Sequence, residues 1–155
     1  MLRLSKKADY ALISMKHLAQ RQDAASASAR EIAGAYDIPI ELLAKVLQKL
    51  VRTGLLRSVQ GTRGGYVLGR ASTGITVGDI IQAIDGPFTV TACSTEHNTC
   101  EQFGKCNIRD PLWRIKERIV SALSTVSLAE MASESDQPLP VSSAPVPAAL
   151  LRTHA

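Results

Sequence analysis

Apolar residues recur at intervals of three and four along several segments of the chain, the spacing that places them on one face of an α-helix. The first such segment follows Ser5, whose hydroxyl can cap a helix, and ends at the small and polar run of residues 21–27. Its apolar stripe consists of Ala8, Leu12, Met15 and Leu18. The pattern therefore predicts an amphipathic helix that packs one face against a core.

Two further helical segments follow at close spacing. Ser28-Ala29-Arg30-Glu31 has the pattern of a capping box, and the helix that it starts must stop before Pro39, because the residue preceding a proline disfavours helical geometry. The next helix ends at Gly54. Its apolar residues are Leu42, Leu43, Val46, Leu47 and Leu50. Two helices joined this tightly predict a helix-turn-helix.

A hairpin and another helix complete the amino-terminal part. Strand-like runs at residues 55–59 and 66–68 flank a glycine-rich turn at residues 60–65, whose glycines permit positive φ. Helix, turn, helix and hairpin is the order of a winged helix. Thr76-Val77-Gly78-Asp79 then starts a helix that Asp85-Gly86-Pro87 ends. We expect a mostly α-helical fold, with residues 1–87 as a winged helix DNA-binding domain.

The remainder divides into a loop, a long helix and a tail. Residues 88–107 form a loop of about twenty residues, a length that is usually functional. Asp110-Pro111 predicts the start of a helix within residues 108–132, and Ser127-Leu128-Ala129-Glu130 is placed to cap a final short turn. Residues 133–155, rich in Pro, Ser and Ala, predict a disordered tail. The helix carries a four-turn apolar stripe of Leu112, Ile115, Ile119 and Val126. This stripe predicts a homodimer interface, and the alternative is that it folds back as core.

Positive charge gathers in the amino-terminal part. Residues 1–70 hold twelve Lys and Arg against five Asp and Glu, a net charge of +7, while residues 71–155 carry −3. In a winged helix the second helix enters the major groove and the wing approaches the next groove. We therefore expect a double-stranded DNA operator as partner, the alternative being a protein-interaction module. The candidate DNA contacts are Lys6, Lys7, Glu41, Lys45, Lys49, Arg57, Gln60, Gly61, Thr62 and Arg63.

Composition argues against several other classes of protein. The 4% aromatic content disfavours a stacking platform for single-stranded nucleic acid. No run approaches the roughly eighteen apolar residues of a membrane helix, and the start of the chain is charged where a signal peptide would be apolar. We expect a cytoplasmic protein with no membrane partner. No Cys/His/Asp dyad is implied by local spacing, so we expect no enzyme.

All three cysteines of the chain, Cys93, Cys100 and Cys106, lie within the loop. Thiolates are soft ligands for zinc, copper(I) or iron-sulfur clusters, and three of them on one loop can surround a single centre. The alternative is three unrelated thiols. A fourth ligand would come from elsewhere, with His97 in the loop and Asp9 on the first helix as candidates; nothing places His17 near the cysteines.

The chain resembles the IscR and NsrR family of bacterial winged-helix regulators over residues 1 to about 132. The resemblance rests on the start Leu4-Ser5-Lys6-Lys7-Ala8-Asp9-Tyr10-Ala11-Leu12, on Leu47-Gln48-Lys49-Leu50-Val51-Arg52-Thr53-Gly54-Leu55-Leu56 with Gly64-Gly65-Tyr66-Val67-Leu68, and on the cysteine triplet followed by Leu112-Trp113. It implies a homodimer joined through the long helix, DNA binding by helix and wing, and a 2Fe-2S or 4Fe-4S cluster on the cysteines. The start is most similar to regulators of the SUF cluster-assembly operon.

This chain departs from the family pattern at several positions. Where IscR-like members have a histidine ligand, three residues after the last cysteine, this chain has Arg109, which cannot coordinate iron. Nitric-oxide-sensing members use an aspartate that Asp9 matches, and Asp9 is therefore the expected fourth ligand. The wing differs from the usual Arg-Gly-Pro-Gly-Gly-Gly, and Ala44 replaces a common acidic reader, which leaves the operator sequence open.

Together these features predict a dimeric winged-helix repressor of iron-sulfur cluster assembly genes that senses through a bound cluster. Cluster occupancy would order residues 88–107 and bias the placement of the two helix-turn-helix units, so that cluster and DNA binding are coupled. The alternatives are a nitric-oxide-responsive repressor of the same family and a zinc-stabilised DNA-binding protein.

Overall fold

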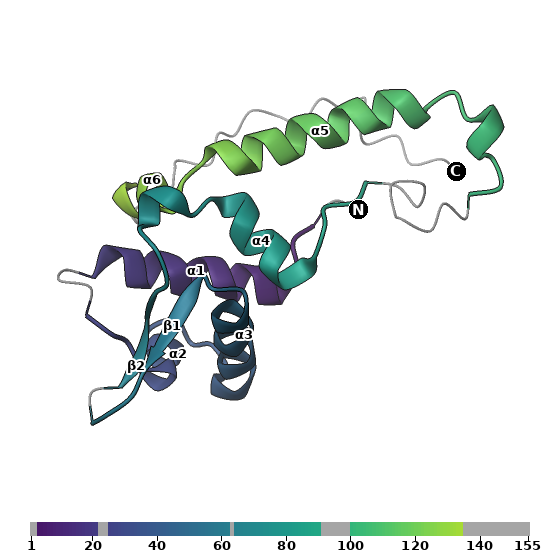
Figure 1. Cartoon of the computed structure of the whole chain (residues 1–155). Coiled ribbons are helices and arrows are strands. Elements are labelled where there is room, and N and C mark those ends of the chain that lie inside the picture. The colour runs from purple at the N-terminus through teal and green to yellow at the C-terminus, as the bar shows by residue number, and fades with distance from the viewer. Residues whose placement is uncertain (1–2, 22–24, 63, 91–99, 135–155) are drawn as a thin grey trace, which may run out of the picture.

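The computed structural model describes residues 3–21, 25–62, 64–90 and 100–134, and is mostly helical with one two-stranded antiparallel sheet (Figure 1). The elements in chain order are α1 (Lys6–Gln20), α2 (Ala29–Ala35), α3 (Ile40–Arg52), β1 (Leu56–Val59), β2 (Gly65–Leu68), η2 (Ser72–Gly74), α4 (Val77–Asp85), η4 (Phe103–Lys105), α5 (Arg109–Thr125) and α6 (Leu128–Ser133). This order confirms the predicted winged helix-turn-helix.

Local hydrogen bonds set the ends of the DNA-binding helices. The Ser5 hydroxyl accepts from the Ala8 amide at the start of α1, and the Ser28 hydroxyl accepts from the Glu31 amide at the start of α2, each at 3.1 Å. Both contacts satisfy backbone donors that have no partner inside the helix. After α3 the chain turns at Gly54, whose φ is +76°. The predicted ends of the helix-turn-helix are thus confirmed.

The wing is held close to the segment that precedes α2. Strand β1 pairs with β2 in the register Leu56 with Leu68 and Val59 with Gly65. The neighbouring residue Tyr66 also exchanges two backbone hydrogen bonds with Ala27, of 2.8 and 3.1 Å. A Cβ atom at Gly65 would lie 2.4 Å from the Ala27 carbonyl oxygen. Glycine is therefore required there by the approach of the two backbones.

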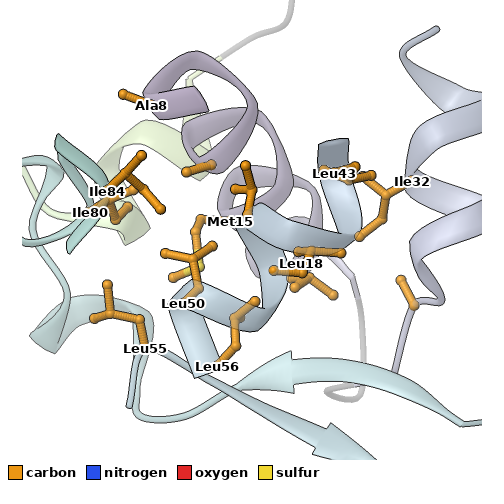
Figure 2. Packing of buried hydrophobic residues seen from close by; sticks show 14 of the residues in the cluster. Ala8, Met15, Leu18, Ile32, Leu43, Leu50, Leu55, Leu56, Ile80 and Ile84 are labelled. Carbon is orange, nitrogen blue, oxygen red and sulfur yellow. The ribbon is translucent and has the colours of Figure 1, made fainter. Parts of the chain in front are cut away.

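The core forms around α1. Ala8, Ala11 and Met15 are fully buried, and Figure 2 shows Met15 in one cluster with Leu50 of α3 and Ile80 of α4. Helices α4 and α6 both pack on α1, whose buried residues include the small side chains of Ala8 and Ala11. Ser14 is the buried polar residue of this helix, and its hydroxyl donates to the Tyr10 carbonyl at 2.7 Å, so its burial leaves no polar group unsatisfied.

The structure differs from expectation after residue 87. Residues 108–132 contain the long helix α5 and then α6, the short turn expected after Ser127, and α6 returns to pack on α1. Ser127 caps α6 with a full capping box, which confirms the predicted start of this short helix. Ser133, which composition places in the tail, is the last residue of α6, while residues 135–155 lie outside the described residues.

Two smaller differences concern the loop and the start of α5. The loop contains the 3-10 helix η4. Helix α5 begins at Arg109 rather than after Asp110, and the Asp110 carboxylate bonds the Arg109 guanidinium at 2.9 Å and does not cap the backbone. Within the described part of the chain, no helix is long and apolar enough to cross a membrane.

Replacing Leu128 by Ala tests whether α6 belongs to the amino-terminal core. Leu128 has no exposed surface and lies in the same cluster as Met15 and Ile80. We expect Leu128→Ala to lower the free energy of unfolding by about 2 to 5 kcal/mol, as large-to-small core substitutions do. Urea denaturation measures this loss. Ile40→Ala, at a residue that is 43% exposed, is the control and should cost less; equal losses would contradict the placement of Leu128 in the core.

Candidate DNA-binding face and cysteine-bearing segment

Helix α3 and the hairpin lie on the same side of α1, with the turn of the hairpin pointing away from the body of the protein (Figure 1). Lys6, Lys7, Glu41, Lys45, Lys49, Arg57, Gln60, Gly61 and Thr62 are all exposed. Arg63 lies outside the described residues. A duplex that approaches this side would meet both α3 and the wing, which is the docking geometry that winged helices use.

Three of the predicted contacts line one groove. Lys7 of α1 and Lys45 and Lys49 of α3 surround a groove of about 260 Å³ with Leu42, Val46 and Ile84. The apolar side chains form the floor and the lysines form the rim. Such a concentration of positive charge attracts phosphate oxygens.

Lys49 differs from Lys45 in what its side chain contacts. Its ammonium donates a hydrogen bond of 2.7 Å to the backbone carbonyl of Ile84, in the last turn of α4. Lys45 makes no hydrogen bond or ion pair with any described residue. Sequence patterns assign both lysines the same role, because a contact between residues 35 apart leaves no local pattern.

The carboxyl end of α4 also contacts the start of α1. The Asp85 carboxylate accepts from the Ser5 amide at 3.1 Å and from the Ser5 hydroxyl. The local sequence predicts Ser5 only as a cap of α1, and Asp85 only as a helix end. The last turn of α4 therefore touches both α1 and α3.

Two of the three cysteines fall within the described residues. Cys100 and Cys106 are free thiols of intermediate exposure that flank η4. The Cys100 carbonyl accepts from the Phe103 amide at 3.1 Å, which starts this turn. Cys93 and His97 lie outside the described residues. Among the described side chains alone, no group of three or more His, Cys, Asp and Glu residues is placed to hold a metal ion.

Asp9 lies in the first turn of α1, where its carboxylate is 3.6 Å from the Lys6 ammonium. The side chains of Asp9 and Lys6 are 41% and 74% exposed, respectively. An exposed ion pair of this kind contributes little to stability. The Asp9 carboxylate is thus accessible to a ligand at small cost, on a helix that lies away from η4 in the protomer (Figure 1).

Arg109 is held by contacts around η4. Its guanidinium lies 4.7 Å from the centre of the Phe103 ring, and one of its nitrogens donates to the Phe103 carbonyl at 3.4 Å. Its hydrogen bond to Asp110 lowers the pKa of that carboxyl. Where the family pattern has a histidine, this chain has a cation that joins η4 to the start of α5.

Helix α5 has one apolar face without cover. None of its residues is buried, and Ile115, together with Val126 at the end of the helix, is 46% and 40% exposed, respectively. Val120 and Leu123 line a groove with Ile81 of α4. The predicted stripe of Leu112, Ile115, Ile119 and Val126 does not fold back into the core, as Leu112 and Ile119 are only partly buried.

His17 contributes to packing of the helix-turn-helix. Its Nδ1 lies 3.0 Å from the Tyr36 hydroxyl at the end of α2, and the two rings meet edge to face. Burial lowers the pKa of His17, and the nearby Arg21 guanidinium acts in the same direction. These contacts give His17 a packing role between α1 and the end of α2.

Comparison with known proteins gives consistent matches over most of the chain. A family model named Rrf2, described as "Iron-dependent Transcriptional regulator", matches residues 4–134. The chain is 32% identical over 136 residues to the HTH-type transcriptional regulator IscR of Yersinia pseudotuberculosis, covering 87% of this chain and 82% of that protein.

Solved structures agree. CymR, the global cysteine regulator of B. subtilis, is similar with a TM-score of 0.71 and 31% identity, over 88% of this chain and all of CymR. IscR of T. potens has a TM-score of 0.68 and 27% identity, over 89% of this chain and 93% of that one.

Proposed function

The chain belongs to the Rrf2 family and is a DNA-binding transcriptional regulator rather than an enzyme, and from this premise we propose that it represses iron-sulfur cluster assembly genes as a homodimer. In this proposal Cys93, Cys100 and Cys106 hold an iron-sulfur cluster, and its state sets the affinity for a double-stranded DNA operator. The observation that carries the proposal is the pair of free thiols, Cys100 and Cys106, on either side of η4.

The donor set fits an iron-sulfur cluster. Cysteine thiolates are the usual ligands of such clusters, and a carboxylate is a harder ligand that exchanges more readily. Asp9 is the proposed fourth ligand, supplied by the partner protomer because η4 and α1 lie apart within one chain (Figure 1). When bound, the cluster would supply an iron centre that oxidants or nitric oxide can attack.

The chain itself supplies the connection between this site and DNA. Cys106 directly precedes the segment in which Arg109 joins η4 to α5, and α5 carries the proposed dimer face. A change in how the cysteines are held would shift the start of α5. The two helix-turn-helix units would then change their spacing relative to the half-sites of the operator.

Asp9 also supports a second candidate, a nitric-oxide-responsive repressor. An iron with a carboxylate ligand is the position most open to attack, and the exposed pair with Lys6 leaves the Asp9 carboxylate accessible. The two candidates share the cluster and the DNA face and differ only in the signal. A third alternative is a zinc-stabilised DNA-binding protein, in which the same thiols would bind zinc and the protein would show no visible absorbance.

The cluster is tested by replacing each cysteine with Ala. We expect anaerobically purified wild-type protein to show visible absorbance with bound iron and sulfide, and each variant to lose all three while remaining dimeric, because the remaining thiolates are too few. Chemical analysis of iron and sulfide measures the loss. Wild-type contents in all three variants would contradict the assignment, and zinc in a colourless wild type would support the zinc alternative.

Iron and sulfide analysis, together with DNA binding, also identifies the fourth ligand of the cluster. Asp9→Ala should retain iron through the thiolates but shorten the lifetime of the cluster in air and remove the dependence of DNA affinity on it. Glu117→Ala, at an exposed carboxylate on α5, is the control. If Asp9→Ala behaves as wild type while His97→Ala loses the cluster, the loop histidine is the ligand.

The DNA face is tested through the salt dependence of binding. Each phosphate contact contributes about 0.9 to the slope of log affinity against log salt concentration. We expect Lys45→Ala to lower the slope by about that amount for every phosphate that Lys45 neutralises, because each such phosphate then keeps its counterions. Fluorescence anisotropy with the operator duplex measures the slope.

Arg63→Ala extends this test to the wing, where it should lower the slope if Arg63 binds phosphate, or relax base preference if it enters a groove. Arg118→Ala removes the same charge from α5 and should change neither quantity. An unchanged slope and unchanged base preference in both Lys45→Ala and Arg63→Ala would remove α3 and the wing from the interface.

The dimer face is tested by placing a charge in the stripe of α5. Ile119→Asp and Ile115→Asp should give folded monomers, because an unpaired carboxylate cannot be buried between two copies of the helix. Analytical ultracentrifugation measures the mass and circular dichroism measures the helix content. Ser121→Asp, on an exposed part of the same helix, should remain dimeric. Unfolded variants would instead place the stripe in the core.

A further inference from the structure

The last turn of α4 is bonded to both helices that carry the proposed DNA contacts. Lys49 of α3 donates to the Ile84 carbonyl at 2.7 Å, and Ser5, which caps α1, donates to the Asp85 carboxylate through its amide at 3.1 Å. Ser5 is 80 residues from Asp85, and Lys49 is 35 residues from Ile84. One turn of helix therefore fixes where α1 and α3 lie relative to α4.

The bond made by Lys49 is a helix cap supplied from another helix. The last carbonyls of a helix have no partner within it and carry the negative end of its dipole. At the end of α4 the Gly86 amide bonds the Gln82 carbonyl, and φ of +83° at Gly86 then turns the chain away. The Ile84 carbonyl is left to accept from a cation, and the Lys49 ammonium fills that role.

From these contacts we infer that Lys49 is a positioning residue, which docks the recognition helix on the end of α4, rather than a phosphate contact. The inference rests on the proposed function only in taking α3 as the recognition helix. Lys45, one turn earlier on α3 and on the rim of the same groove, remains the phosphate contact.

This docking gives the cysteine-bearing segment a short path to α3. Residues 88–107 begin directly after Asp85, Gly86 and Pro87. Phe88, the first of them, lines the groove between α4 and α5. A rearrangement of this segment that displaces Phe88 would also displace the last turn of α4, to which Lys49 is hydrogen-bonded. The orientation of α3 would then depend on the segment that bears the cysteines, without any contact between that segment and DNA.

Replacing either Lys45 or Lys49 with Met removes one positive charge and keeps a side chain of similar length. Comparing the two variants therefore tells whether Lys49 positions α3 or binds phosphate. In the full-length protein, Lys45→Met should lower the salt slope by about 0.9 for each phosphate that Lys45 neutralises. Lys49→Met should leave the slope unchanged and weaken DNA binding by roughly fivefold at every salt concentration, the fold-change of about one net hydrogen bond. Lys49→Arg should restore the affinity, since a guanidinium can also donate to the Ile84 carbonyl.

A second measurement needs neither DNA nor iron. Hydrogen exchange of the full-length protein should show faster exchange, by roughly fivefold, at the last turn of α4 in Lys49→Met and not in Lys45→Met. The amides of α6 serve as the internal reference and should exchange at the wild-type rate in both variants.

The outcomes distinguish this inference from the proposed function. If Lys49→Met lowers the salt slope as Lys45→Met does and leaves exchange in α4 unchanged, Lys49 is a phosphate contact and the inference is overturned. If wild-type protein does not bind the operator at all, the proposed function fails, and exchange in α4 still decides whether Lys49 docks α3.

Discussion

The structure depends on burying α1 from several sides at once. Ala8, Ala11 and Met15 have no exposed surface, and α3, α4 and α6 each pack on this helix. A helix so enclosed must have small residues where its neighbours approach and must satisfy any polar group internally, as Ser14 does with the Tyr10 carbonyl. Because α3, α4, α6 and the hairpin all contact this one helix, their positions are set relative to a common support.

Because the core is filled by apolar side chains, the lysines and the described cysteines that could bind DNA or metal lie outside it. Lys7, Lys45 and Lys49 line one groove because α1 and α3 come together there beside Ile84 of α4. Cys100 and Cys106, by contrast, flank η4 just before the start of α5 and are not part of the core. The DNA-binding helices and the cysteine-bearing segment are connected through the last turn of α4, which is hydrogen-bonded to Ser5 at the start of α1 and to Lys49 of α3. The cysteine-bearing segment follows directly after this turn.

Features with a local cause can be predicted from the sequence, and features with a distant cause cannot. Ser5, Ser28 and Thr76 start their helices as expected, because a cap and its donor lie within four residues. The capping box at Ser127 likewise indicates the start of α6, whereas the packing of α6 on α1 is a long-range contact that apolar periodicity does not indicate. The contacts of Lys49 and Asp85 join elements far apart in sequence, so no local pattern indicates them. The cysteine triplet is visible as a spacing, and its three-dimensional arrangement needs Cys93, which lies outside the described residues.

The uncovered face of α5 links the proposed dimer to the cysteine-bearing segment. The helix buries Val120 and Leu123 partly against α4 and leaves Ile115 and Val126 exposed, so one side belongs to its own protomer and the other is available to a second copy. Under the proposed function, the same helix then carries the dimer face and receives any displacement of the cysteine-bearing segment through Arg109. Coupling between two sites is reciprocal, so a cluster that strengthens operator binding must itself be held more tightly when the operator is bound. A repressor built this way would release its cluster more readily from free protein than from protein on DNA.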